Sequence, residues 1–139
     1  EEPLRVSMHS DPFFVDWDGD GDLDLLSGSA QGGVYCAENT GTKTKPAFRA
    51  FAEMVAPSGH ETAPQVTTDD EHFRSPGGST RVWADDVDRD GLLDLLIGDQ
   101  IELLQPAEGV DLDTAKQRFA EWHAEFEKLM DSSPWNDGK

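Results

Sequence analysis

Two nine-residue segments of the chain carry aspartates at the same spacing, and both have the composition of a loop that binds a hard cation. Residues 16–24 read DWDGDGDLD and residues 86–94 read DVDRDGLLD, so both fit the pattern D-x-D-x-D-G-x-x-D. Carboxylates at positions 1, 3, 5 and 9 around a glycine turn supply the oxygen ligands that Ca²⁺ prefers. Two carboxylates about 4 Å apart repel each other by roughly 4 kcal/mol at an effective dielectric constant near 20. The spacing therefore predicts a cation that neutralises each loop; a metal-free turn is the alternative.

A D-x-D-x-D-G segment also opens an EF-hand loop, which ends in a bidentate glutamate at position 12 and lies between two helices. Position 12 is Ser27 in the first segment and Ile97 in the second, and neither residue has a carboxylate. The flanking segments are typical of β-strands, with the run Phe13-Phe14-Val15 before the first loop and leucine-rich runs closed by glycine after both. These features exclude an EF-hand.

The composition is that of a polar and strongly acidic chain with the length of one domain. Its 139 residues include 29 acidic and 11 basic side chains, which give a net charge of −18 and a pI near 4.2. Such a charge argues against binding to a nucleic-acid backbone or an anionic membrane, which both favour basic surfaces. Cys36 is the only cysteine, so no intrachain disulfide can form, and its apolar neighbours predict that it packs as a small hydrophobe.

The remaining sequence predicts β structure, one polar interruption and one helix. Residues 12–51 read as β structure, which continues to residue 55 as four short strands separated by turns. The stretch 56–79, rich in proline, glycine and threonine, is expected to be a surface insertion or linker. Strands are expected again at 80–84, 93–97 and 101–104. Apolar residues then recur at three- and four-residue steps over 111–130, which predicts an amphipathic helix. Residues 132–139 are expected to form a tail.

Both aspartate segments resemble the FG-GAP/VCBS repeat family, the β-propeller blades also found in the integrin α-subunit headpiece. The first segment matches through VDWDGDGDLDLL at 15–26, GGVY at 32–35, ENTG at 38–41 and PAF at 46–48. The second matches through residues 83–98, and it then departs by lacking the Asn-Thr-Gly turn. The resemblance implies a mainly β fold made of antiparallel four-stranded meander blades. It assigns residues 1–55 to a first blade and 80–106 to a second, incomplete one, followed by the amphipathic helix at 107–131.

The resemblance also implies ligands for two Ca²⁺ ions, with four side chains and one backbone carbonyl oxygen in each loop. The implied ligands of the first site are the side chains of Asp16, Asp18, Asp20 and Asp24 and the carbonyl oxygen of Asp22. Those of the second site are the side chains of Asp86, Asp88, Asp90 and Asp94 and the carbonyl oxygen of Leu92. Asp85 is expected to be a solvated neighbour of the second site rather than a ligand.

These features predict a calcium-binding propeller module of a secreted, periplasmic or cell-surface protein, with a structural or interaction role and no enzymatic activity. Two blades cannot close a propeller, which usually has about four to eight. Other blades or a protein partner are therefore the expected partners. The alternatives are a lectin-like propeller that binds carbohydrate and an accessory domain of a larger carbohydrate-active enzyme.

The other candidate residues do not indicate a catalytic site. No nucleophile motif is present in the sequence. The four histidines lack metal-ligand spacing and are expected to lie on the surface: His9, His60, His72 and His123. Trp17 and Trp83 lie beside the loops, and packing is favoured over partner contact for both.

Overall fold

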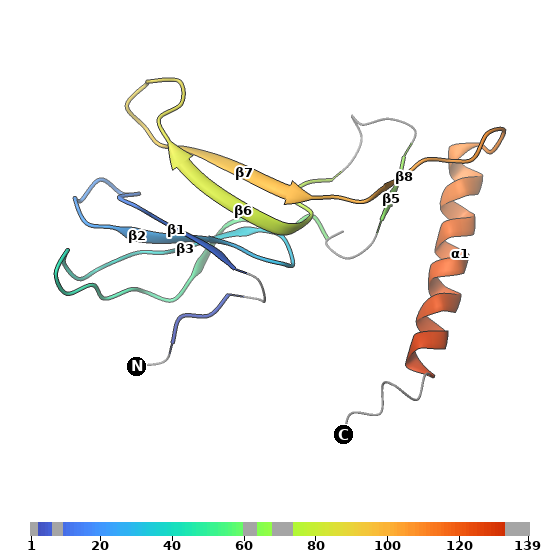
Figure 1. Cartoon of the computed structure of the whole chain (residues 1–139), viewed down its shortest axis with the longest axis horizontal. Helices are drawn as coiled ribbons and strands as arrows, with labels where there is room; N and C mark the ends of the chain where they lie inside the picture. The colour runs from blue at the N-terminus through green and yellow to red at the C-terminus, as the bar shows by residue number, and fades with distance from the viewer. Residues whose placement is uncertain (1–2, 7–9, 60–63, 68–73, 133–139) are drawn as a thin grey trace. The chain divides into compact units, whose positions relative to one another are not determined.

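A computed structural model describes residues 3–6, 10–59, 64–67 and 74–132, and these form two compact units (Figure 1). The larger unit comprises residues 1–64 and 74–102, and the smaller comprises residues 65–73 and 103–139. Three of the histidines and most of the expected tail lie outside the described residues. No helix in the described part of the chain combines the length and apolar character needed to span a membrane.

The larger unit begins with a four-stranded antiparallel meander, which confirms the predicted mainly β fold. Its strands lie side by side in chain order. They are β1 (Asp11–Val15), β2 (Asp24–Gly28), β3 (Val34–Ala37) and β4 (Ala52–Val55). The turn between β2 and β3 closes with a hydrogen bond of 3.1 Å from Gly32 N to the carbonyl oxygen of Ser29. Gly32 and Gly33 have φ angles of 82° and 78°, which glycine adopts without steric cost.

A second antiparallel hairpin repeats the first one further along the chain. It consists of β6 (Gly78–Asp85) and β7 (Asp94–Gln100). Phe13 lies opposite Leu26 in the first hairpin, and Trp83 lies opposite Leu96 in the second, so the register is conserved at an offset of 70 residues. The aspartate segments therefore connect equivalent strands in two copies of one structural unit.

The core of the larger unit lies between the meander and the second hairpin. Leu26 and Val34 are fully buried, and they cluster with Val82 and Ala84 of β6. The residues of β6 alternate strictly between buried and exposed, as expected for a strand with one covered face. At the edge of this interface a Cβ on Gly28 would overlap the carbonyl group of Thr80, so glycine permits the close approach of two backbones.

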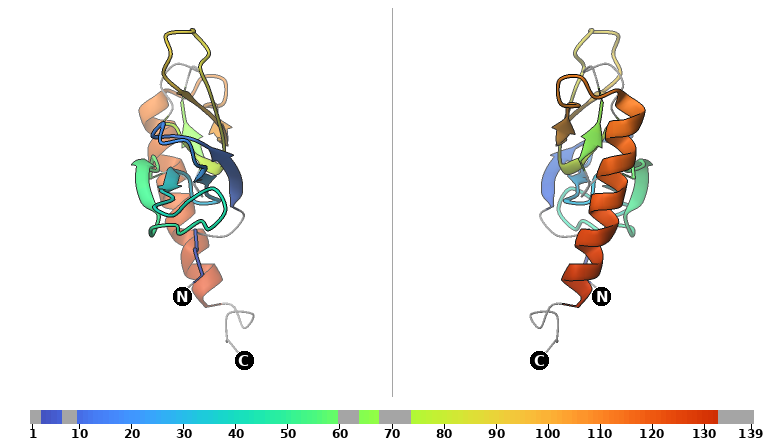
Figure 2. Two further views of the ribbon diagram at one scale, coloured as in Figure 1. Left: turned by 90° about the vertical axis from the view of Figure 1, so that its left-hand side faces the viewer. Right: turned by 90° about the vertical axis from the view of Figure 1, so that its right-hand side faces the viewer.

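The smaller unit contains the predicted helix and one short sheet. Helix α1 (Leu112–Asp131) is a single continuous helix in all views (Figures 1 and 2). It begins at Asp111, whose Oδ1 accepts a 2.9 Å hydrogen bond from Thr114 N as a helix N-cap. The sheet has two parallel strands, β5 (Gln65–Val66) and β8 (Leu103–Leu104).

Strand β8 differs from the expectation that residues 101–104 would form a third strand of the second blade. It pairs with β5, which lies in the stretch expected to be a linker, rather than with β7. The polar 56–79 stretch thus supplies β5 and the first residues of β6. Within the larger unit, the described part of the second repeat is the two-stranded hairpin of β6 and β7.

Candidate metal centres

Each aspartate segment forms the loop at the end of one hairpin, so the strands fix its two ends. Residues 16–24 connect β1 to β2, and residues 86–94 connect β6 to β7. The second of these loops projects beyond the strand ends of its hairpin (Figure 1). Because the two hairpins share one register, equivalent aspartates begin from equivalent backbone positions.

The last aspartate of each segment ties the loop back to its first turn. Asp24 Oδ2 accepts a 2.9 Å hydrogen bond from Trp17 N, and Asp94 Oδ2 accepts one of 3.0 Å from Val87 N. Each bond spans seven residues and closes the loop into a ring. Position 9 of the pattern is therefore a structural clasp in both loops, in addition to being an implied calcium ligand.

The aspartates at positions 3 and 5 orient the backbone inside the ring. Each accepts a hydrogen bond from the N–H group two residues later, which is the geometry of an Asx turn. The bonds run from Asp20 N to Asp18 Oδ1 (3.1 Å), Asp22 N to Asp20 Oδ1 (2.9 Å), Asp90 N to Asp88 Oδ1 (3.1 Å) and Leu92 N to Asp90 Oδ1 (2.8 Å). These matching bonds give the two loops the same backbone path.

The glycine at position 6 is required by its conformation in both loops. Gly21 and Gly91 have φ angles of 93° and 90°, a region that residues with a Cβ rarely adopt. Position 4 is also left-handed, with φ of 77° at Gly19 and 65° at Arg89. Arg89 therefore carries a backbone strain that its glycine counterpart in the first loop does not.

The loops bring three carboxylates together in each hairpin, with oxygen atoms that all lie within 4.8 Å of one another. The first group is Asp16, Asp18 and Asp20, and the second is Asp86, Asp88 and Asp94. Asp24 and Asp90, which the sequence also assigns as ligands, are not members of these groups. Asp85 is outside the second group as well, and its Oδ1 accepts a 3.0 Å hydrogen bond from Asp86 N.

Two carboxylate oxygens of the first loop are buried without a hydrogen-bond partner in the part of the chain that the structure describes. They are Asp16 Oδ1 and Asp22 Oδ1. A buried charged oxygen without a partner is costly, because it has lost its hydration without replacement. A hard cation with oxygen ligands would compensate this cost, so the donor set of the first loop fits Ca²⁺.

The side chain of Asp22 is a feature that the sequence pattern did not reveal. The pattern assigns only its backbone carbonyl oxygen as a ligand, yet its side chain is only 8% exposed. Burial raises the pKa of the Asp22 carboxyl above its usual value, and the negative charges of the neighbouring aspartates, Asp20 foremost, raise it further. The equivalent residue in the second loop is Leu92. This difference between the repeats is the sequence signal that could have singled out the side chain of Asp22.

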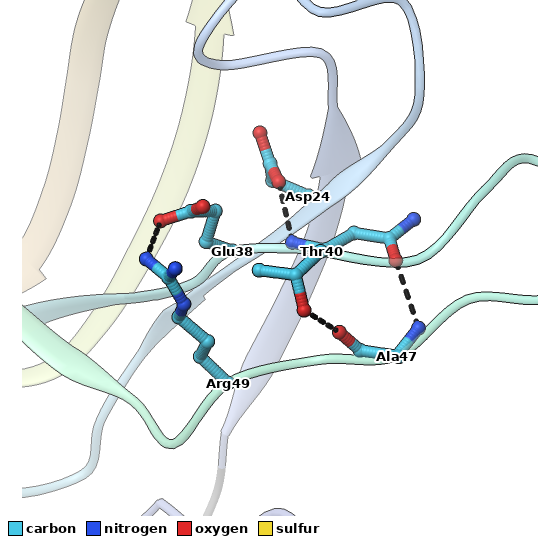
Figure 3. A network of polar contacts seen from close by, with 6 residues as sticks. Asp24, Glu38, Thr40, Ala47 and Arg49 are labelled. Atoms are coloured by element: carbon cyan, nitrogen blue, oxygen red, sulfur yellow. Dashed lines mark hydrogen bonds and ion pairs between the residues drawn. The ribbon is translucent and has the colours of Figure 1, made fainter.

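The first loop is also clamped by the turn that follows β3, as Figure 3 shows. Asp24 is 2% exposed, and its Oδ1 accepts a 2.8 Å hydrogen bond from Asn39 N. The side-chain oxygen of Asn39 in turn accepts hydrogen bonds from Gly41 N (3.1 Å) and Ala47 N (2.8 Å). A surface ion pair of 2.7 Å between Arg49 and Glu38 lies beside this turn. Asn39 was predicted as a turn residue, but its link to the loop aspartate was not.

The second loop folds one of its own carboxylates inward instead. Asp86 Oδ1 accepts a 3.0 Å hydrogen bond from Asp90 N, and Asp86 Oδ2 accepts another of 3.0 Å from Gly91 N. Asp94 is exposed, unlike its nearly buried counterpart Asp24. The second loop is therefore held by local bonds, whereas the first is held by the turn that follows β3 as well.

Comparison with known protein families agrees with this repeated architecture. A model of the FG-GAP-like repeat matches residues 16–97, from the first aspartate of one loop to the strand that follows the other. The chain belongs to the FG-GAP-like repeat family. The match covers more than half of the chain and includes both loops, so the family resemblance inferred from the sequence is confirmed. No curated protein and no solved structure shows significant similarity to the chain.

An FG-GAP-like repeat indicates a module of the β-propeller type, which interacts with other blades or with protein partners. Two side chains of this module agree with the sequence predictions. Cys36 and Trp17 both pack against the core. Burial raises the pKa of the Cys36 thiol to about 11, with smaller contributions from nearby carboxylates, so the thiol stays protonated at neutral pH.

Trp83 differs from the packing that was favoured for it. Its side chain is 58% exposed, because it lies on the uncovered face of β6, where residues alternate with buried ones. His123 Nδ1 lies 3.8 Å from the carboxylate of Glu127. Among the described residues, His123 belongs to no group of potential metal ligands.

Proposed function

We propose that this FG-GAP-like module binds Ca²⁺ in both hairpin loops and serves a structural and interaction role without catalysing a reaction. The observation that carries the proposal is the pair of buried, unpartnered carboxylate oxygens on Asp16 and Asp22. They belong to a loop whose other aspartates already order the backbone through hydrogen bonds. The residues that would hold the ion are the aspartates assigned above at positions 1, 3, 5 and 9 of each loop, with the backbone carbonyl at position 7.

Bound Ca²⁺ would supply the positive charge that these closely spaced carboxylates lack. Because the ligands converge only in the folded hairpins, binding free energy would become folding free energy. At a free Ca²⁺ concentration 100 times Kd, this stabilisation is about 2.7 kcal/mol for each site. Ca²⁺ concentrations outside the cell suit exposed loops of modest affinity. This supports a secreted, periplasmic or cell-surface location for the proposed function.

Calorimetric titration with Ca²⁺, combined with thermal unfolding in EDTA and in Ca²⁺, tests the proposal. We expect two binding sites and a higher Tm in Ca²⁺. The variant Asp20→Ala should lose the first site and keep the second, and the matched variant Asp90→Ala should do the reverse. Absence of binding at millimolar Ca²⁺, or equal Tm values in the two buffers, would refute calcium binding. Saturable sugar binding on a glycan array would favour the lectin-like alternative over a purely structural module.

A further inference from the structure

The outer face of the second hairpin carries a group of exposed apolar side chains. Trp83 and Leu96 lie directly opposite each other in the register of β6 and β7. Their exposed fractions are 58% and 42%, and Val87, at the start of the neighbouring loop, is 61% exposed. We refer to Trp83, Leu96 and Val87 as the leading face. A cluster of large apolar residues on a strand surface marks an interaction site when it is not covered.

The equivalent face of the first hairpin is buried within the same structural unit. At the offset of 70 residues, the counterparts of the leading face are Phe13, Leu26 and Trp17. Leu26 is fully buried, and Phe13 and Trp17 pack against the core. The strand that covers this region is β6, through Val82 and Ala84. The first hairpin therefore shows what a covered leading face looks like.

On the opposite faces of the two hairpins, the residues of the second hairpin are buried and those of the first are exposed. On β6 the covering face consists of Thr80, Val82 and Ala84, with exposed fractions of 1%, 9% and 5%. Its counterparts on the first hairpin are Ser10, Pro12 and Phe14, which are all exposed, and Phe14 is 52% exposed. We refer to these three counterparts as the trailing face. Each of the six positions compared is thus covered in one hairpin and uncovered in the other.

The trailing face also offers room for a large side chain. A cavity of about 530 Å³ opens beside Phe14 and is lined mainly by apolar residues, including Leu23, Pro46 and Phe48. The rings of Phe14 and Phe48 lie 6.2 Å apart and form its aromatic wall. An indole such as that of Trp83 matches an apolar and aromatic cavity of this kind.

We propose that this chain associates head to tail with a second copy of itself, the leading face of one copy packing on the trailing face of the next. The contact would repeat the one that already joins the two hairpins inside each copy. It deepens the interaction role proposed above and rests on that role, but it does not rest on calcium binding. A head-to-tail contact closes into a ring when its rotation allows. With the two hairpins of the described residues in each copy, a propeller of about four to eight blades would contain about two to four copies of this segment.

The test measures molar mass in solution for the chain and for variants of each face. The chain is expected at two to four times its mass of 15.3 kDa. Trp83→Glu removes the leading face and Phe14→Glu removes the trailing face, so each variant alone should be monomeric. Mixed together, each variant keeps the face that the other lacks, and the mixture should form a one-to-one dimer. Leu96→Glu provides a second variant of the leading face, and Trp122→Glu on α1 is the control that should assemble normally.

Three results would overturn the inference: a monomeric chain at all concentrations tested, assembly of Trp83→Glu like the unmodified chain, or a mixture that stays monomeric. A Phe14→Glu variant that still dimerises while Trp83→Glu is monomeric would also overturn it, because that result indicates a symmetric contact between two leading faces. Calorimetric titration of the same variants separates this inference from the calcium proposal. Trp83→Glu should bind two Ca²⁺ ions as a monomer, whereas loss of Ca²⁺ binding in all proteins would refute the metal sites alone.

Discussion

The two hairpin loops share one sequence pattern and one internal hydrogen-bond scheme, but they differ in what surrounds them. The first loop lies in a four-stranded meander, where Asp24 is 2% exposed and accepts a hydrogen bond from Asn39 in the turn that follows β3. The second belongs to a two-stranded hairpin, where Asp94 is exposed and Asp86 bonds within its own loop. The comparison indicates that the pattern specifies the path of the loop, whereas the surrounding blade determines how rigidly it is held.

The largest difference in stability between the two loops is expected when the aspartate at position 9 is replaced. Asp24→Ala would leave the N–H groups of Trp17 and Asn39 without an acceptor in a buried region. A buried donor that loses a charged partner costs about 1–3 kcal/mol, so we expect about 3 kcal/mol lower stability. Asp94→Ala removes one bond at an exposed position, and we expect a loss below about 1 kcal/mol. Urea unfolding in EDTA measures both; equal losses would show that the blade does not hold the first loop.

A smaller effect is expected for the turn that clamps the first loop. Asn39 is 3% exposed, and its Oδ1 accepts the N–H groups of Gly41 and Ala47. Asn39→Ala should lower the free energy of unfolding by about 2 kcal/mol. It should also weaken Ca²⁺ binding at the first site only, which titration calorimetry can resolve. The matched control Thr40→Val removes one exposed hydrogen bond to Ala47 and should cost less than about 1 kcal/mol.

Acid titration should distinguish the loops through Asp22, whose counterpart is Leu92. Because burial raises the pKa of Asp22 in the folded chain, the folded state binds its proton more tightly than the unfolded state. Without Ca²⁺, the contribution of Asp22 to stability should therefore fall as pH rises from the unfolded pKa through the folded pKa. Asp22→Asn should remove this dependence and raise the Tm in EDTA at neutral pH. If Asp22→Asn leaves the Tm in EDTA at pH 7 unchanged, the buried carboxylate of Asp22 does not destabilise the metal-free loop.

The features that depend on residues close in the chain could be predicted from the sequence. The aspartate spacing identified both loops, and the change from alternating to three- and four-residue periodicity located the helix. The offset between the loops also indicated a repeated unit, and the identical register of Phe13 with Leu26 and Trp83 with Leu96 shows that repeat in three dimensions.

The features that depend on distant contacts could not be predicted in the same way. The pairing of Gln65–Val66 with Leu103–Leu104 joins two-residue strands from segments of mixed composition, which are too short to show a periodic pattern. The exposure of Trp83 also has no local signal, because it follows from which face of β6 is covered. The orphaned oxygens of Asp16 and Asp22 likewise arise from burial by the complete blade.

The smallest difference between the loops is expected at position 4, where both backbones are left-handed. Arg89 has a φ of 65°, and a residue with a Cβ loses roughly 1–2 kcal/mol in this region relative to the right-handed one. Glycine avoids this strain but loses more entropy on folding, so Arg89→Gly should stabilise the chain by about 0.5–1 kcal/mol. The reverse variant, Gly19→Arg, should destabilise it by a similar amount. Arg89→Gly also removes a positive charge from the second loop, so its Ca²⁺ affinity should rise while that of the first site stays constant. A drop in stability in EDTA would mean that Arg89 stabilises the metal-free loop by offsetting its carboxylates more than its backbone strain destabilises it.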